Sequence, residues 1–151
     1  MNVLMVTAQY FPVMGGIETH VHEVGRRLVR SGVDVTILTT RPRSDETTSS
    51  NEMIEGMNVI RVPMWPNQRD YYLAPAMYAI IRSKAWDLVH CQGCHTFVPP
   101  LAMTAAKIAR VPYILTFHTG GHSSPIRSSI RTKQWQVQRQ LYASARKLIG
   151  V

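Results

Sequence analysis

Residues 3–39 read VLMVTAQYFPVMGGIETHVHEVGRRLVRSGVDVTILT, and the architecture of the whole chain can be predicted from them. The apolar run Val3–Ala8 indicates a buried strand, and a loop over Gln9–Gly16 follows it. Apolar residues then recur at helical spacing up to Gly32, which stands where a helix C-cap glycine is expected. The β-branched run Val33–Thr39 indicates a second strand. A strand, a glycine loop, a helix and a strand form a βαβ unit, which requires a parallel sheet.

The rest of the chain continues this alternation of strands and helices. We expect further strands at Met57–Pro63, Asp87–Cys91, Pro112–His118 and from Lys147 to Val151, and helices at Tyr71–Arg82, Phe97–Arg110 and from about Ile130 to Arg146. Residues 41–56 are polar and are interpreted as a surface loop. The sequence therefore predicts one α/β domain over residues 1–151, a Rossmann-like three-layer fold with a mostly parallel sheet of about six strands.

Composition places the chain among globular proteins. Its 151 residues are 45% hydrophobic and 17% charged, which excludes a disordered tail or a collagen-like chain. No apolar run approaches the roughly 18–20 residues that span a membrane, and the N-terminus lacks the basic and apolar segments of a signal peptide. Two cysteines argue against a disulfide scaffold. We therefore expect a cytoplasmic protein.

Charge is distributed unevenly along the sequence. The net charge is +8, yet residues 1–87 hold nine Lys and Arg together with all nine Asp and Glu. Residues 88–151 hold eight basic side chains and no acidic one. This half faces an anion, or its acidic complement lies elsewhere. We expect no nucleic acid among its partners, because no recognised nucleic-acid-binding motif accompanies the charge.

The parallel sheet brings one set of loops together at the predicted ligand edge. Ligands of such sheets bind outside the carboxyl ends of the strands. The segments expected there are rich in Gly, His, Arg and aromatic residues and contain no carboxylate: Gln9–Gly16, Thr40–Arg43, Pro63–Trp65, Gln92–His95 and His118–His122. This composition disfavours a glycosidase with two catalytic carboxylates. The lack of a Gly-x-Ser-x-Gly motif argues against a Ser-His-Asp hydrolase.

Candidate ligand-contacting residues follow from these loops. Gly15 and Gly16 would let backbone N–H groups at the start of the first helix approach a phosphate, although a plain tight turn explains the pair equally well. His118 could donate to a sugar hydroxyl or a phosphate, or serve as a hydrogen-bonded structural residue at the rim. The sequence leaves open whether His20 and His22 face the cleft or solvent.

Residues 91–95 read Cys-Gln-Gly-Cys-His, which matches the sequence pattern of a haem c attachment site, but we reject that interpretation. Cys91 falls in a predicted core strand, and no export signal precedes it. A zinc site is rejected as well, because neighbouring residues on a strand, here His90 and Cys91, point to opposite faces. We expect no metal and no cofactor.

Three segments resemble landmarks of one enzyme family. Residues 3–22, the motif Asp87-Leu-Val-His90 and the motif Thr116-Phe-His118-Thr resemble the N-terminal domain of retaining glycosyltransferases of family 4, which have the GT-B fold. The resemblance covers the whole chain. It implies an acceptor-side domain, which in that family closes over a cleft with a C-terminal domain that binds the nucleotide-sugar.

The resemblance also implies roles for individual residues. Gly15 and Gly16 would approach the donor diphosphate, and His118 would lie beside the transferred sugar as the catalytic candidate. Gln92 departs from the family pattern, because many members carry a second histidine at this position. The candidates on the acceptor side are Tyr10, His20, Arg61, His90 and Gln92.

The C-terminal donor-binding domain, with its Arg, Lys and Glu-x7-Glu motif, is expected to be absent, since no two Glu here stand eight apart. We therefore expect a domain that is inactive alone, either a truncated product or half of a split enzyme with a separate donor-domain chain. Its substrates would be a nucleotide-sugar and a sugar or lipid-linked acceptor. The alternative is a non-catalytic module that binds an anion or an anionic membrane surface, peripheral at the inner membrane face.

Overall fold

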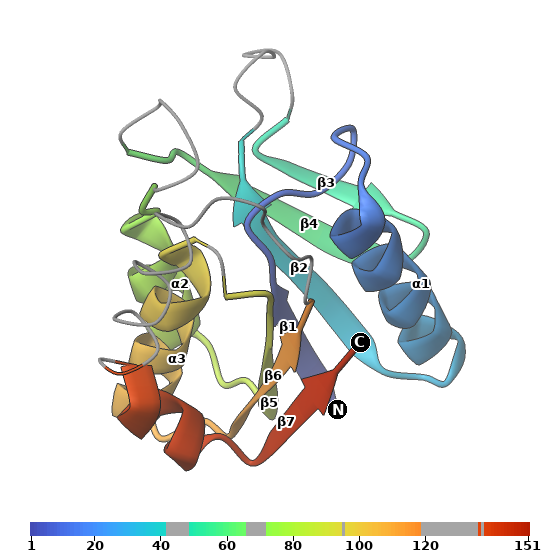
Figure 1. The fold of residues 1–151 in the computed structure, drawn as a ribbon. Coiled ribbons are helices and arrows are strands. Elements are labelled where there is room, and N and C mark those ends of the chain that lie inside the picture. The colour runs from blue at the N-terminus through green and yellow to red at the C-terminus, as the bar shows by residue number, and fades with distance from the viewer. Residues whose placement is uncertain (42–48, 66–71, 95, 119–135, 137) are drawn as a thin grey trace.

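The computed structural model describes residues 1–41, 49–65, 72–94, 96–118, 136 and 138–151, and its centre is a seven-stranded sheet (Figure 1). The strands follow the spatial order β3-β4-β2-β1-β5-β6-β7. In chain order the elements are β1 (Asn2–Val6), α1 (Gly16–Arg30), β2 (Asp34–Thr40), β3 (Asn51–Ile54), β4 (Met57–Val62), α2 (Ala76–Ser83), β5 (Leu88–Gln92), α3 (Val98–Ile108), β6 (Tyr113–Phe117) and β7 (Lys147–Gly150).

Strand β1 lies at the point where the order of the sheet reverses. On one side it pairs in parallel with β2, which pairs with β4; on the other side it pairs in parallel with β5, followed by β6 and β7. The chain therefore builds β2, β3 and β4 on one side of β1 and then crosses to the other side, where it builds β5, β6 and β7. In such sheets the crevice for a ligand lies outside the carboxyl ends of the two strands at the reversal, here β1 and β5.

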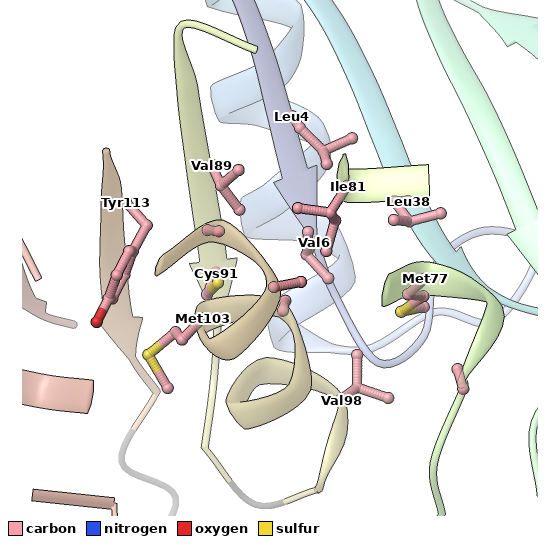
Figure 2. Close-up of a cluster of buried hydrophobic side chains, with 14 of the residues drawn as sticks. Leu4, Val6, Leu38, Met77, Ile81, Val89, Cys91, Val98, Met103 and Tyr113 are labelled. Atoms are coloured by element: carbon pink, nitrogen blue, oxygen red, sulfur yellow. The ribbon is translucent and has the colours of Figure 1, made fainter. Parts of the chain in front are cut away.

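The two faces of the sheet carry separate hydrophobic clusters, and β1 contributes to both. Val3 and Met5 belong to the cluster beneath α1, whereas Leu4 and Val6 belong to the cluster beneath α2 and α3. Figure 2 shows the second cluster, in which side chains from the central strands meet those of the two helices. This alternation with a period of two produces the three layers visible in Figure 1 and confirms the predicted α/β architecture.

Helix α1 approaches the sheet closely because one of its inward positions is a glycine. A Cβ atom added at Gly25 would lie 2.5 Å from the Sδ atom of Met57 and 3.7 Å from a side-chain carbon of Ile37. The helix ends where the sequence predicts, with Gly32 at a φ of 81° just after the last turn. The strand–helix–strand unit of residues 3–39 is thus confirmed.

The interpretation of residues 41–56 as a surface loop is wrong for its last part. Asn51–Ile54 forms β3, which pairs antiparallel with β4 at the edge of the sheet. A tight turn joins the two strands through Glu55 and Gly56, whose φ angles are 47° and 82°. The strand escaped prediction because it is short, polar and exposed on alternate residues, so it carries no apolar run.

Two further boundaries differ from those predicted. Helix α2 begins at Ala76 rather than near Tyr71, because Leu73 pairs with Trp65 through two backbone hydrogen bonds of 2.7 and 2.8 Å. Residues 138–144 are helical, as expected for the end of the last predicted helix, but its earlier part and the 119–129 loop lie outside the described residues. In the described part of the chain no helix is long and apolar enough to cross a membrane.

Candidate ligand site at the carboxyl edge of the sheet

A chain of hydrogen bonds links four polar side chains at the carboxyl ends of β5 and β6. Nε2 of His90 lies 2.8 Å from Oγ1 of Thr116 and 3.0 Å from the amide nitrogen of Gln92. The amide oxygen of Gln92 lies 2.9 Å from Nε2 of His118, which directly follows β6. We call these four residues the switch-point cluster, because β5 is one of the two strands at the reversal of the sheet.

The alternation of the strands explains why these side chains meet. Along β5, Val89 and Cys91 enter the core beneath α2 and α3, so His90 and Gln92 point to the other face. Strand β6 runs parallel to β5 with Thr116 opposite Gln92. The cluster therefore forms from polar residues at every second position of two adjacent strands.

The cluster is buried, and hydrogen bonding compensates for that burial. Gln92 and Thr116 are each only 1% exposed and His90 is 7% exposed. A buried polar group without a partner costs about 1–3 kcal/mol, and here each of the three has at least one partner. Such a network fixes the orientation of its members. The half-buried His118 ring is therefore held in place by its hydrogen bond to Gln92.

Burial also sets the protonation state of His90. Its pKa is lowered to about 4, first because burial disfavours the charged ring and then because of the nearby His20 and His118. His90 is therefore neutral at physiological pH, and its ring has one nitrogen that donates and one that accepts.

Helix α1 brings a second histidine and its own N-terminus to this edge. The ring of His20 packs edge-on against that of His118, with 5.0 Å between the ring centroids. Gly15 is the N-cap of α1 and lacks a side-chain cap, and Gly16 is the first helical residue. A Cβ atom at Gly16 would meet none of the described residues within 4 Å, so they leave the backbone there open to a ligand. A Cβ at Gly15 would instead lie 2.5 Å from the carboxylate of Glu18, which shares the positive end of the helix.

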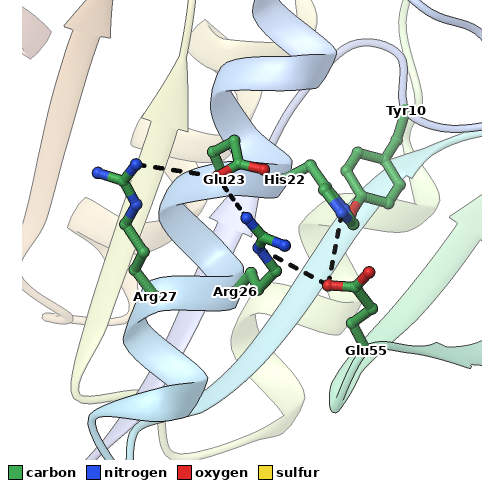
Figure 3. Close-up of polar contacts among 6 residues, drawn as sticks. All are labelled: Tyr10, His22, Glu23, Arg26, Arg27 and Glu55. Carbon is green, nitrogen blue, oxygen red and sulfur yellow. Dashed lines mark hydrogen bonds and ion pairs between the residues drawn. The ribbon is translucent and has the colours of Figure 1, made fainter.

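Tyr10 and Arg61, two of the predicted acceptor-side residues, lie outside the switch-point cluster. Tyr10 is buried, and its hydroxyl lies 2.8 Å from Nδ1 of His22; burial and the charge of Glu55 raise the pKa of Tyr10 to about 12. Figure 3 shows these side chains and the neighbouring ion pairs that Arg26 forms with Glu23 on α1 and with Glu55 in the turn between β3 and β4. Tyr10 is thus joined to α1 through His22 rather than to the switch-point cluster.

The guanidinium of Arg61 is occupied by groups of the protein. It forms an ion pair with Glu52 of β3 and donates to the backbone carbonyls of Phe11, at 2.6 Å, and Ser49, at 3.2 Å. Its side chain is 1% exposed. Arg61 therefore ties the loop after β1 to the β3–β4 edge, and its effect on a ligand would pass through that loop.

Sequence reasoning missed Thr116 as a member of the site. The signal was present, because Thr116 stands two residues before His118 just as His90 stands two residues before Gln92. Neither cysteine forms a disulfide: Cys91 is buried, which raises the pKa of its thiol, and Cys94 is half-buried. Within the described residues, no group of three or more His, Cys, Asp and Glu is arranged to hold a metal ion.

Comparisons with known proteins support one family. A family model described as a glycosyl transferase 4-like domain matches residues 15–151. The chain is 28% identical over 174 aligned residues to a glycogen synthase of Mycobacterium tuberculosis, covering 99% of this chain and 42% of that protein. It is 31% identical to a D-inositol 3-phosphate glycosyltransferase of Nocardiopsis dassonvillei, covering 70% of this chain and 27% of that protein.

Two more similarities extend this result. A GDP-mannose:cellobiosyl-diphosphopolyprenol alpha-mannosyltransferase of Xanthomonas campestris is 29% identical, with 80% of this chain and 32% of that protein covered. The crystal structure of Acinetobacter baumannii MurG matches with a TM-score of 0.58 and 15% identity, covering 99% of this chain and 41% of that one. At that identity the match supports the fold alone. The chain spans less than half the length of each of these proteins.

The burial of neutral His90 predicts a specific loss of stability in acid. Below a pH of about 6.5 the unfolded chain takes up a proton at this residue, whereas the folded chain does not until the pH approaches 4. The free energy of unfolding therefore falls as the pH is lowered through that window, and the contribution of His90 between pH 7 and 4.5 is about 2–3 kcal/mol.

Urea unfolding of the native chain and of His90→Gln at both pH values measures this contribution. Because both proteins share the acid sensitivity of the carboxylates, the difference between their pH dependences isolates residue 90. We expect the variant to lose less stability in acid. Equal losses would contradict this prediction, because they would mean that His90 takes up its proton as readily in the folded chain as in the unfolded chain.

Proposed function

The chain belongs to the glycosyl transferase 4-like domain family, and we propose that it is the acceptor-side half of a GT-B glycosyltransferase that transfers a sugar from a nucleotide-sugar with retention of configuration. The observation that carries this proposal is the switch-point cluster. Its half-buried His118 and the open backbone at Gly16 both lie at the carboxyl edge of the sheet, where this class of fold binds ligands.

We assign the roles as follows. The N–H groups at Gly15 and Gly16 approach the donor diphosphate, where the start of α1 favours negative charge. His118 hydrogen-bonds the transferred sugar, and His20, beside it, faces the acceptor. His90 and Gln92 support His118 from the sheet, while Tyr10 and Arg61 act through the loop after β1.

In the proposed reaction the donor phosphate assists deprotonation of the acceptor hydroxyl on the face from which the diphosphate leaves. The contribution of the protein is then to position the two substrates and to stabilise developing charge. A sugar or a lipid-linked sugar is the acceptor class we propose. Similarity to a mannosyltransferase whose name includes a diphosphopolyprenol supports the lipid-linked case.

The proposal requires a donor-binding half, in the same protein or in a separate chain. We expect residues 1–151 alone to transfer no sugar. Fused to the donor-side half of a GT-B glycosyltransferase, they should give turnover toward the about 1–10³ per second that is typical of enzymes. His118→Ala in the fusion should lower turnover by about 10²-fold, because one preorganised hydrogen bond to the reacting sugar is lost.

Arg27→Gln is the matched control for the fusion, because Arg27 lies on α1 but is exposed and pairs with Glu23 of the same helix. It should leave turnover unchanged, and thermal unfolding should show that both variants fold. Full turnover by the His118→Ala fusion would contradict the assigned role, and ordinary turnover by the unfused chain would contradict the need for a donor half.

One observation favours membrane binding as a second function. Five exposed basic residues of the C-terminal half lie in the described part of the chain, and no ion pair found there involves them: Lys107, Arg110, Arg139, Arg146 and Lys147. All except Arg139 stand at the end of α3 or the start of β7, at the amino edge of the sheet. That edge is opposite the proposed diphosphate site. An anionic membrane surface therefore accounts for these charges better than the donor diphosphate does.

Arg146→Gln should therefore weaken binding to vesicles with anionic lipids by about fivefold, because each basic residue near such a surface contributes about 1 kcal/mol. Arg27→Gln is the control, since Arg27 is exposed on α1 near Glu23, in the other helical layer. Co-sedimentation at low and high salt measures both. Absence of binding to anionic vesicles at low salt, or equal effects of the two changes, would refute the membrane surface.

A further inference from the structure

The side-chain amide of Gln92 lies between two histidine rings and faces each with a different end. Its nitrogen is 3.0 Å from Nε2 of His90, and its oxygen is 2.9 Å from Nε2 of His118. The amide is almost fully buried, so water does not supply alternative partners for it. One amide therefore contacts a ring nitrogen of both histidines, with a donor group on one side and an acceptor group on the other.

The protons on the His90 side follow from the chemistry of the amide nitrogen. A primary amide nitrogen only donates, so Nε2 of His90 must accept and the proton of this neutral ring stands on Nδ1. The hydroxyl of Thr116, 2.8 Å from the same Nε2, can donate to it as well. In this arrangement the two donors share the one lone pair of this nitrogen. If the amide were turned around, Nε2 of His90 would carry the proton and the Thr116 hydroxyl would need another acceptor.

The protons on the His118 side follow from the amide oxygen. A carbonyl oxygen only accepts, so Nε2 of His118 must carry a proton. Two states of the ring satisfy this requirement, namely the neutral ring with its proton on Nε2 and the doubly protonated cation. The neutral ring with its proton on Nδ1 does not, because it would direct a lone pair at the oxygen of Gln92.

We propose that Gln92 is a positioning residue that fixes the proton of His118 on Nε2, and with it the tautomer and orientation that this ring presents at the carboxyl edge of the sheet. The inference rests on the proposed function for its consequence. Under that function, the ring that meets the transferred sugar is held in one tautomer and one orientation. His20 on α1 and His90 on β5 are the titratable groups shown to lie near this ring.

Nitrogen-15 NMR of the labelled chain tests the proposal directly, because protonated and unprotonated ring nitrogens resonate far apart. We expect His118 with its proton on Nε2, and His90 with its proton on Nδ1. The His90 signal is the more discriminating one, since neutral histidine in water already favours the Nε2 proton. A coupling across the hydrogen bond from the Gln92 amide nitrogen to Nε2 of His90 should also be observed. A proton on Nε2 of His90, or on Nδ1 of neutral His118, would overturn the proposal.

Gln92→Met keeps the size of the side chain and removes both polar ends. We expect the single protonation pattern of the two rings to be lost, with part of His90 moving its proton to Nε2. Gln138→Met, which removes a second buried glutamine of the described chain, is the matched control and should leave both rings unchanged. If Gln92→Met left both patterns intact, Gln92 would not be the residue that fixes them; if it did not fold, the native spectrum still decides.

These measurements are independent of sugar transfer. The expected ring pattern in a chain whose fusion to a donor half transfers no sugar would leave this inference standing and refute the proposed function. Transfer by the fusion combined with the opposite pattern would do the reverse.

Discussion

The reversal of strand order at β1 is the constraint on which the rest of the structure depends. Strand β1 is buried on both faces, with alternate side chains in the two hydrophobic clusters, and it pairs with β2 on one side and β5 on the other. Because right-handed connections from a central strand run in opposite directions, α1 covers one face of the sheet while α2 and α3 cover the other (Figure 1). At the carboxyl ends of β1 and β5 these connections diverge, and sheets of this kind bind their ligands there.

The switch-point cluster uses the same alternation for a different purpose. On β5 the residues facing α3 are apolar, whereas those facing the other way include His90 and Gln92. Hydrogen bonds there take the place of apolar packing, and their directionality fixes the orientation of the groups they join. The result is a rigid base beneath His118, next to a helix start that is open at Gly16.

The sequence was sufficient for most of the fold, because apolar runs and helical spacing are local signals. It failed at β3, where pairing with β4 rather than apolar character makes the strand. The candidate site was predicted only in outline. His118, Gln92 and His90 could be placed at one edge, but the contact between residues 26 apart depends on the register of β5 against β6. Arg61 shows the same limit, since its partner Glu52 belongs to the unpredicted strand.

Hydrogen–deuterium exchange of the chain fused to a donor-side half, with and without nucleotide-sugar, tests most directly that the ligand occupies the edge at the strand reversal. Backbone amides at that edge should be protected by the ligand, at residues 15–20, 92–94 and 116–118. Amides at the amino edge, at residues 109–114 and 146–148, should exchange at the same rate in both states. Protection confined to the amino edge, or absent from the helix start and the ends of β5 and β6, would contradict the account.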